Sequence, residues 1–170
     1  QDRLRKPDSN LWIFVAEDDK GHIVGFISGG KARDKKMKKY TGELYAIYIL
    51  KKHQGKNVGL ALTKKLCSIL KSNGFNSMYV CVLKDNPSKS FYIKYGAQLL
   101  KTEMIEIGGK KLPEEYYGWD NLSVFKKIFD RSTIDLLNIK ISSRRLLLVP
   151  ISLKYKRSIF REFTDEITKY

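Results

Sequence analysis

The segment 53–62, HQGKNVGLAL, contains residue types that suit the binding of a phosphate group. It follows an apolar run, ELYAIYIL, and leads into a helix-like run that starts near Val58. A helix N-terminus leaves backbone N–H groups without intrahelical partners and carries partial positive charge. Gly55 and Gly59 would leave room for an anion, and Asn57 tolerates left-handed backbone geometry. The pattern favours a phosphate or pyrophosphate site, although an ordinary strand-to-helix turn would show the same glycines.

The apolar patterns around this segment predict a mixed α/β sheet. We expect strands at 11–17, 22–28, 43–50, 77–83, 98–107 and 114–119, and helices at 58–72 and 88–95. The crossover through 58–72 implies that the strands on either side of it run parallel, while the other neighbours form hairpins. The GGKKLP stretch at 108–113 is expected to be a turn. The basic stretch 31–39 is expected to be a solvated hairpin loop.

The run GELYAIYILKKHQGKNVGLALTKKL resembles the core of a GNAT-family N-acetyltransferase. The acetyl-coenzyme A motif of that family is Gln/Arg-x-x-Gly-x-Gly/Ala. The corresponding residues here are Gln54, Gly55, Lys56, Asn57, Val58 and Gly59. Asn57 stands where the family usually has a glycine. This departure bears on the shape of the loop, although asparagine can supply the same backbone conformation.

A second family signature follows, NPSKSFYIKYGA. It matches the family pattern at Asn86, Phe91, Tyr92 and Gly96, and Ala97 replaces the usual aromatic residue. The resemblance covers roughly residues 10–122. It implies a mostly antiparallel sheet with a central, splayed parallel pair and flanking helices. The first strand and first two helices of the family are expected before residue 10 and are mostly missing.

The resemblance also implies where acetyl-coenzyme A would bind as co-substrate. In the family the pantetheine arm pairs with a splayed strand, which corresponds here to the backbone of Tyr48, Ile49 and Leu50. The pyrophosphate would lie on the turn 54–59, and Asn86 would contact the cofactor arm. The strand residues are also compatible with a plain core role.

The implied chemistry is direct attack of a free amine on the acetyl thioester, which needs a base and a proton donor. Glu43, at the head of the strand 43–50, is the candidate base, directly or through water; it is equally compatible with a solvated strand-end carboxylate. Tyr92 matches the tyrosine of the second signature and is the candidate acid, with a packed aromatic as the alternative. The acceptor is expected to be a small amine, a polyamine or a protein N-terminus.

Composition leaves other functions open. The net charge of +15, from 33 Lys and Arg against 18 Asp and Glu, is compatible with a basic nucleic-acid or ribosome-associated protein, although nucleic acid is not the favoured partner. A cofactor-binding module without turnover is a third interpretation. Cys67 and Cys81 are expected to be reduced core thiols, and no Cys/His cluster suggests a metal. Without an export signal or transmembrane run we expect a cytoplasmic protein, and a homodimer is compatible with the sequence.

The charge and apolar patterns divide the chain into three parts. Residues 1–122 form the expected acetyltransferase domain, lacking its N-terminal part. Residues 123–140 are expected to be a linker with helical character. Residues 141–170 resemble the opening strand and helix of a second such domain, of the ribosomal-protein-alanine N-acetyltransferase type, or else form a C-terminal appendage that packs on the first domain or on a partner.

Overall fold

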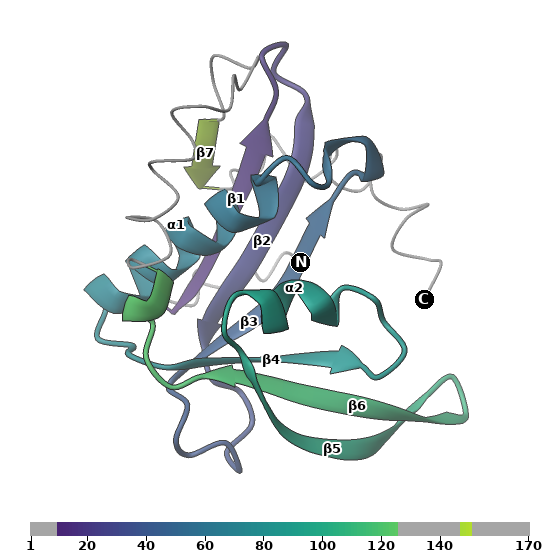
Figure 1. The fold of residues 1–170 in the computed structure, drawn as a ribbon. Helices are drawn as coiled ribbons and strands as arrows, with labels where there is room; N and C mark the ends of the chain where they lie inside the picture. The colour runs from purple at the N-terminus through teal and green to yellow at the C-terminus, as the bar shows by residue number, and fades with distance from the viewer. Residues whose placement is uncertain (1–9, 126–146, 151–170) are drawn as a thin grey trace, which may run out of the picture.

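The computed structural model describes residues 10–125 and, for the backbone, residues 147–150. These residues form one sheet of seven strands in the order β5-β6-β4-β3-β2-β1-β7, with two α-helices (Figure 1). Every neighbouring pair is antiparallel except β3 and β4, which confirms the predicted mixed sheet with one parallel pair. The strands are β1 (Leu11–Glu17), β2 (Ile23–Lys31), β3 (Gly42–Ile49), β4 (Met78–Leu83), β5 (Gln98–Ile107), β6 (Lys110–Trp119) and β7 (Leu147–Pro150). The helices are α1 (Val58–Ser72) and α2 (Lys89–Lys94), and a short 3-10 helix spans Lys51–His53.

The main core lies between the sheet and the two α-helices. Helix α1 packs across β1, β2 and β3, and the spacing of four residues in Leu62, Leu66 and Leu70 puts these fully buried side chains on one face (Figure 1). They belong to the same cluster as Leu44 of β3 and Met78 of β4. The helix therefore fixes the position of β3, the strand that leads into the glycine-containing turn.

A second, smaller core covers part of the opposite face of the sheet. Met37 and Tyr40, from the loop between β2 and β3, are buried there together with Tyr79 and Tyr116. The Tyr40 hydroxyl donates a hydrogen bond of 2.7 Å to the carboxylate of Asp120. The basic stretch 31–39 leads into this anchored loop, so the prediction of a simply solvated loop misses the apolar residues that hold it down.

The hairpin between β5 and β6 is tighter than the sequence suggested. Ile107 is the register partner of Lys110, which leaves only Gly108 and Gly109 in the turn. Both glycines have positive φ, at 57° and 77°, as a two-residue turn of type I′ requires. The prediction of a turn over 108–113 was therefore too long, because β6 begins directly after the two glycines.

Strand β7 lies alongside β1, at the edge of the sheet farthest from β5 (Figure 1). The pairing is antiparallel, with Val149 opposite Val15 and Leu148 opposite Ala16. The rest of the predicted linker and second unit, 126–146 and 151–170, lies outside the described residues. The proposed division of the chain into domains stays a prediction, and the pairing of β7 with β1 bears on it.

Candidate active site

The two parallel strands separate soon after they meet. Strands β3 and β4 pair only through Gly42 with Met78, Glu43 with Tyr79 and Leu44 with Val80. Beyond this point β3 pairs with β2 on its other side, and β4 pairs with β6, so that the two strands diverge (Figure 1). Within residues 10–125 the facing edges of this splay have no strand partner. Such edges offer backbone N–H and C=O groups to an extended guest that carries amide groups.

A bulge in β3 lies at the start of the splay. Gly29 of β2 pairs with Leu44, and Ser28 pairs with Ala46, so Tyr45 is an extra residue in β3. A bulge of this kind bends the strand and changes the direction of the side chains that follow it. It therefore contributes to the separation of β3 from β4.

The turn 54–59 has a geometry suited to an anion. Gly55 has a φ of 71° and Asn57 a φ of 59°, both in the left-handed region. Asn57 precedes α1 as its N-cap residue and makes no side-chain capping hydrogen bond. The first backbone hydrogen bond of the helix runs from Ala61 N–H to the Asn57 carbonyl, and no described residue accepts one from the N–H groups of 55–60. Successive free N–H groups at a helix N-terminus form a concave anion site.

Packing also requires a glycine at position 59, whose role of leaving room for an anion stays a prediction. A Cβ atom at this position would lie 2.8 Å from Cδ1 of Ile49 and 3.2 Å from Cε2 of Phe91. The missing side chain therefore lets α1 approach β3 and α2 closely. By contrast, a Cβ on Gly55 would meet no atom within 4 Å, so Gly55 is favoured by its backbone conformation.

The electrostatic field at the turn is positive. Partial burial lowers the pKa of His53, and the ammonium groups of Lys56 and Lys52 lower it further. The Gln54 side chain donates a hydrogen bond of 3.0 Å to the Ile49 carbonyl and so ties the turn to the end of β3. Gln54 thus holds the turn in place, and the lysines supply the charge.

The other predicted cofactor residues lie at the open end of the splay. Asn86 follows β4 as the turn 54–59 follows β3, and its side-chain oxygen accepts a hydrogen bond of 2.9 Å from the Ser88 N–H at the start of α2. The Tyr48 ring stacks on Phe26 with centroids 5.2 Å apart. Leu50 donates its N–H to the Val24 carbonyl at 3.0 Å. The fold thus places the predicted residues around the same opening.

Tyr92 lies in α2 and is 5% exposed. Its ring packs edge-on against Trp119, with centroids 6.1 Å apart. Burial, and to a lesser extent Tyr48, raises the pKa of the Tyr92 phenol to about 12. No hydrogen bond between described residues uses its hydroxyl, so at neutral pH this phenol keeps a proton that it can donate.

Glu43 is buried, with 4% of its surface exposed, and both of its carboxylate oxygens have partners. The Arg33 side chain donates to one oxygen through Nε at 3.1 Å and Nη2 at 2.5 Å. The other oxygen accepts from the Arg33 backbone N–H at 2.9 Å and from the Tyr79 hydroxyl at 2.7 Å. The carboxylate in turn raises the pKa of the Arg33 guanidinium. Glu43 is therefore placed at the start of the splay, but it is held by four donor groups.

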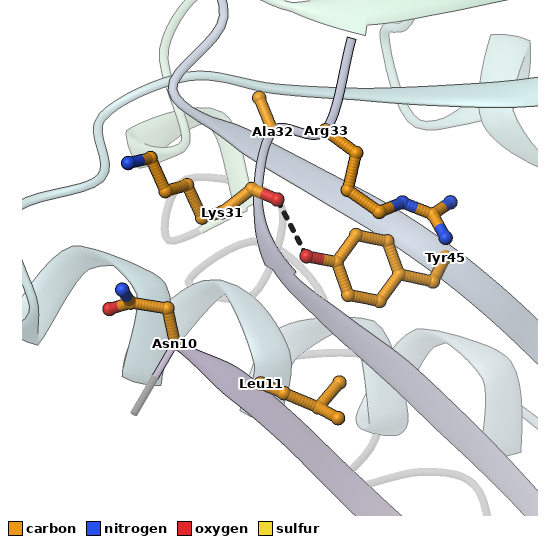
Figure 2. A pocket seen from close by; sticks show the side chains of 6 residues that line it. All are labelled: Asn10, Leu11, Lys31, Ala32, Arg33 and Tyr45. Carbon is orange, nitrogen blue, oxygen red and sulfur yellow. Dashed lines mark hydrogen bonds between the residues drawn. The ribbon is translucent and has the colours of Figure 1, made fainter. Parts of the chain in front are cut away.

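A hollow of about 370 Å³ opens beside the Arg33 side chain (Figure 2). The Arg33 guanidinium lies 4.1 Å from the centroid of the Tyr45 ring. The Tyr45 hydroxyl donates a hydrogen bond of 2.6 Å to the Lys31 carbonyl, the dashed line in Figure 2. Sequence reasoning missed Arg33, Tyr45 and Tyr79, since no local pattern shows that a loop arginine pairs with a carboxylate ten residues later.

Three further features concern the described part of the chain. Cys67 and Cys81 are both free; Cys67 is buried, and burial raises the pKa of the half-buried Cys81 thiol to about 12. No group of His, Cys, Asp and Glu side chains among the described residues could hold a metal ion. None of the helices described is long and apolar enough to cross a membrane.

Comparison with known proteins points to one family. The model of the acetyltransferase (GNAT) family matches residues 1–97. The uncharacterized N-acetyltransferase YuaI of Bacillus subtilis strain 168 is 41% identical over 119 residues, which cover 70% of this chain and 68% of YuaI.

Solved structures share the fold. ACIAD1637 from Acinetobacter baylyi ADP1 is 25% identical, with a TM-score of 0.53, over 64% of this chain and 62% of that one. YncA from Salmonella typhimurium, solved with its cofactor acetyl-CoA, is 23% identical, with a TM-score of 0.54, over 65% of this chain and 64% of that one. The chain therefore spans a little under two thirds of these two structures.

Proposed function

Since the chain belongs to the GNAT family of acetyltransferases, we propose that it is an N-acetyltransferase that moves the acetyl group of acetyl-CoA directly to a primary amine. The observation that carries this proposal is the turn 54–59 with its free N–H groups, placed where β3 leaves the splay. A pyrophosphate fits the turn, and the arm that extends from it fits the unpaired edge of β3. YncA, which shares the fold, is solved with acetyl-CoA.

The proposed cofactor contacts combine charge and backbone groups. The pyrophosphate would accept hydrogen bonds from the turn, with Lys51, Lys52 and Lys56 nearby as counter-charges. The pantetheine amides would pair with backbone groups of 48–50. The Ile49 carbonyl already accepts from Gln54 and the Leu50 N–H already donates to the Val24 carbonyl, so the remaining backbone groups of this stretch would carry the pairing. Asn86 would close the opposite side of the arm from the end of β4.

The proposed reaction needs two proton movements. Attack by the amine nitrogen forms the N–C bond, and the C–S bond breaks as coenzyme A leaves. We assign protonation of the departing sulfur to the Tyr92 hydroxyl, which stays protonated at neutral pH. The amine must also lose a proton before it attacks. Glu43 is the base that the sequence favours, and this role stays a prediction because four donor groups already engage its carboxylate.

The acceptor is proposed by chemical class only. A small amine, a polyamine and a protein N-terminus all present a primary amine to the splay. The hollow is lined by Tyr45 and by Arg33, which binds the buried Glu43, so it is a candidate for the part of the acceptor that surrounds the amine.

A paired binding and transfer experiment tests the proposal. Calorimetry with acetyl-CoA measures binding, and release of free coenzyme A thiol in the presence of primary amines measures transfer. Lys56→Glu should weaken acetyl-CoA binding about tenfold, equivalent to about 1.4 kcal/mol, because it reverses a charge at the turn. Lys110→Glu is the matched control, since Lys110 is exposed like Lys56 but lies in the β5–β6 hairpin.

The outcomes separate the competing functions. Weaker binding in Lys56→Glu alone, together with amine-dependent thiol release by the wild type, supports an enzyme with its cofactor on the turn. Binding without release for any amine would indicate a cofactor-binding module. Equal loss of affinity in both variants would remove the turn as the phosphate site.

A further inference from the structure

We propose that Glu114, on β6, takes the proton from the acceptor amine, and that Glu43 positions the loop beside the site through Arg33. This inference rests on the proposed acetyltransferase function and assigns its missing base. The sheet carboxylates near the splay differ in the partners that they have.

Glu114 lies at the open end of the splay. It is the register partner of Leu83, the last residue of β4, three residues beyond the point where β3 and β4 stop pairing. Its neighbour Glu115 accepts hydrogen bonds from the Tyr117 hydroxyl and from Lys89 of α2, so Glu115 is on the helix-covered face. Because side chains alternate along a strand, Glu114 faces the other side.

The same face carries the Glu43 network. Tyr116, two residues after Glu114, stacks on Tyr79 with centroids 6.1 Å apart. The Tyr79 hydroxyl is the group that donates to Glu43. Two aromatic rings therefore connect the region of Glu43 at the start of the splay with that of Glu114 at its end. An acceptor that reaches the splay from this face would pass between the two carboxylates.

The two carboxylates differ in what they can do. Glu43 is bound by four donor groups, so its lone pairs are occupied. Glu114 is only partly buried, and no ion pair between described residues includes it. It can therefore accept a proton and pass it to water.

The surroundings of Glu114 favour proton uptake. Burial raises the pKa of Glu114, as do the carboxylates of Glu103 and Glu43, whereas Tyr116 and Lys101 lower it; the net direction is upward. Glu103 is its direct register partner on β5, and like charges directly opposite one another repel. The charged and titratable groups around it are Glu103 and Lys101 on β5, Tyr116 on β6, Cys81 on β4, Glu43 on β3, and Arg33, which binds Glu43.

The proton transfers balance in the proposed step. The ammonium form of the acceptor gives one proton to the Glu114 carboxylate, which releases it to solvent. The neutral amine then forms the N–C bond with the acetyl carbon. As the C–S bond breaks, the sulfur receives a proton from Tyr92, and Tyr92 recovers one from the nitrogen. The products are an amide, a thiol and one free proton.

A comparison of two amines tests the role of Glu114. An alkylamine is mostly protonated at neutral pH and needs a base, whereas aniline is already neutral. Glu114→Gln should lower kcat/KM about a hundredfold for the alkylamine and change it little for aniline. Acetyl-CoA affinity, measured by calorimetry, should not change. Glu106→Gln, an exposed carboxylate on β5, is the matched control and should behave as wild type.

Glu43→Gln gives the contrasting pattern. If Glu43 is a positioning residue, its substitution should lower the turnover of both amines by similar factors. The pH profile of the variant for the alkylamine should keep its acidic limb. A selective loss of the alkylamine in Glu43→Gln, with Glu114→Gln near wild type, would overturn the assignment. So would an equal loss of both amines in Glu114→Gln. If the wild type acetylated no primary amine, the proposed function would fail and this role with it, whereas alkylamine transfer by Glu114→Gln at the rate of an active wild type would refute the role alone.

Discussion

Gly59 at the start of α1 lies so close to Ile49 at the end of β3 that a Cβ atom on the glycine would be 2.8 Å from Cδ1 of the isoleucine. This contact joins the strand that would carry the pantetheine arm to the helix whose N-terminus would hold the pyrophosphate. The distance between these two parts of the proposed site thus depends on the absence of a side chain at position 59. The glycine of the family motif acts here through packing, while Gly55 shapes the backbone of the turn.

Gly59→Ala should therefore destabilise the protein, and Ile49→Val should relieve the effect. Overpacking costs about 1–3 kcal/mol, and Ile49→Val alone costs about 1 kcal/mol. Valine lacks the Cδ1 atom, so the double variant should lose less stability than the sum, by at least about 0.5 kcal/mol. Chemical denaturation measures all four proteins. Ile27→Val, a buried residue of β2, is the control partner, and strict additivity with Ile49→Val would contradict the packing role.

His53 should report occupancy of the turn. Its pKa lies below the ordinary histidine value because of burial and two lysines, so the neutral form is favoured in the folded protein. The unfolded chain binds the proton more readily, and the unfolding free energy should therefore fall as the pH drops through about 6.5. A pyrophosphate on the turn should raise the pKa of His53, and acetyl-CoA should bind more tightly at lower pH.

An NMR titration of the two histidines with and without acetyl-CoA measures this effect. His22, whose Nδ1 lies 3.2 Å from the Asp18 carboxylate, is the internal comparison and should shift less. An unchanged His53 titration in the presence of saturating acetyl-CoA would place the phosphates elsewhere.

Local pattern predicted the elements of this fold, whereas the partners of the site residues depend on contacts distant in sequence. The helix 58–72 and the strand 98–107 follow their periodicities, and their bounds agree with the structure. The paired state of Glu43 depends on Tyr79, 36 residues away, and no pattern in either segment reveals it. The role of Gly59 likewise depends on where α2 places Phe91.

Tyr92→Phe should slow turnover about a hundredfold and leave acetyl-CoA affinity unchanged. The phenylalanine keeps the edge-on packing against Trp119 and removes only the hydroxyl that would protonate the sulfur. Steady-state kinetics under conditions where chemistry limits the rate provide the measurement, with calorimetry for binding. Tyr95→Phe, in the turn that follows α2, is the control, since its ring packs on Phe91. Equal effects of the two substitutions would assign Tyr92 a packing role alone.

The pairing of β7 with β1 leads to a test of residues 123–170, which we call the tail. If 147–150 is an integral edge strand, Val149→Pro should remove the ladder hydrogen bond opposite Val15 and lower the melting temperature by roughly 5–10 °C. Val149→Ile keeps strand propensity and should remain near wild type. The uncovered edge of β1 should also promote self-association, which size-exclusion chromatography with light scattering detects. A proline variant as stable and as monodisperse as the isoleucine variant would instead favour a tail that belongs to a separate folding unit, as the sequence alone suggested.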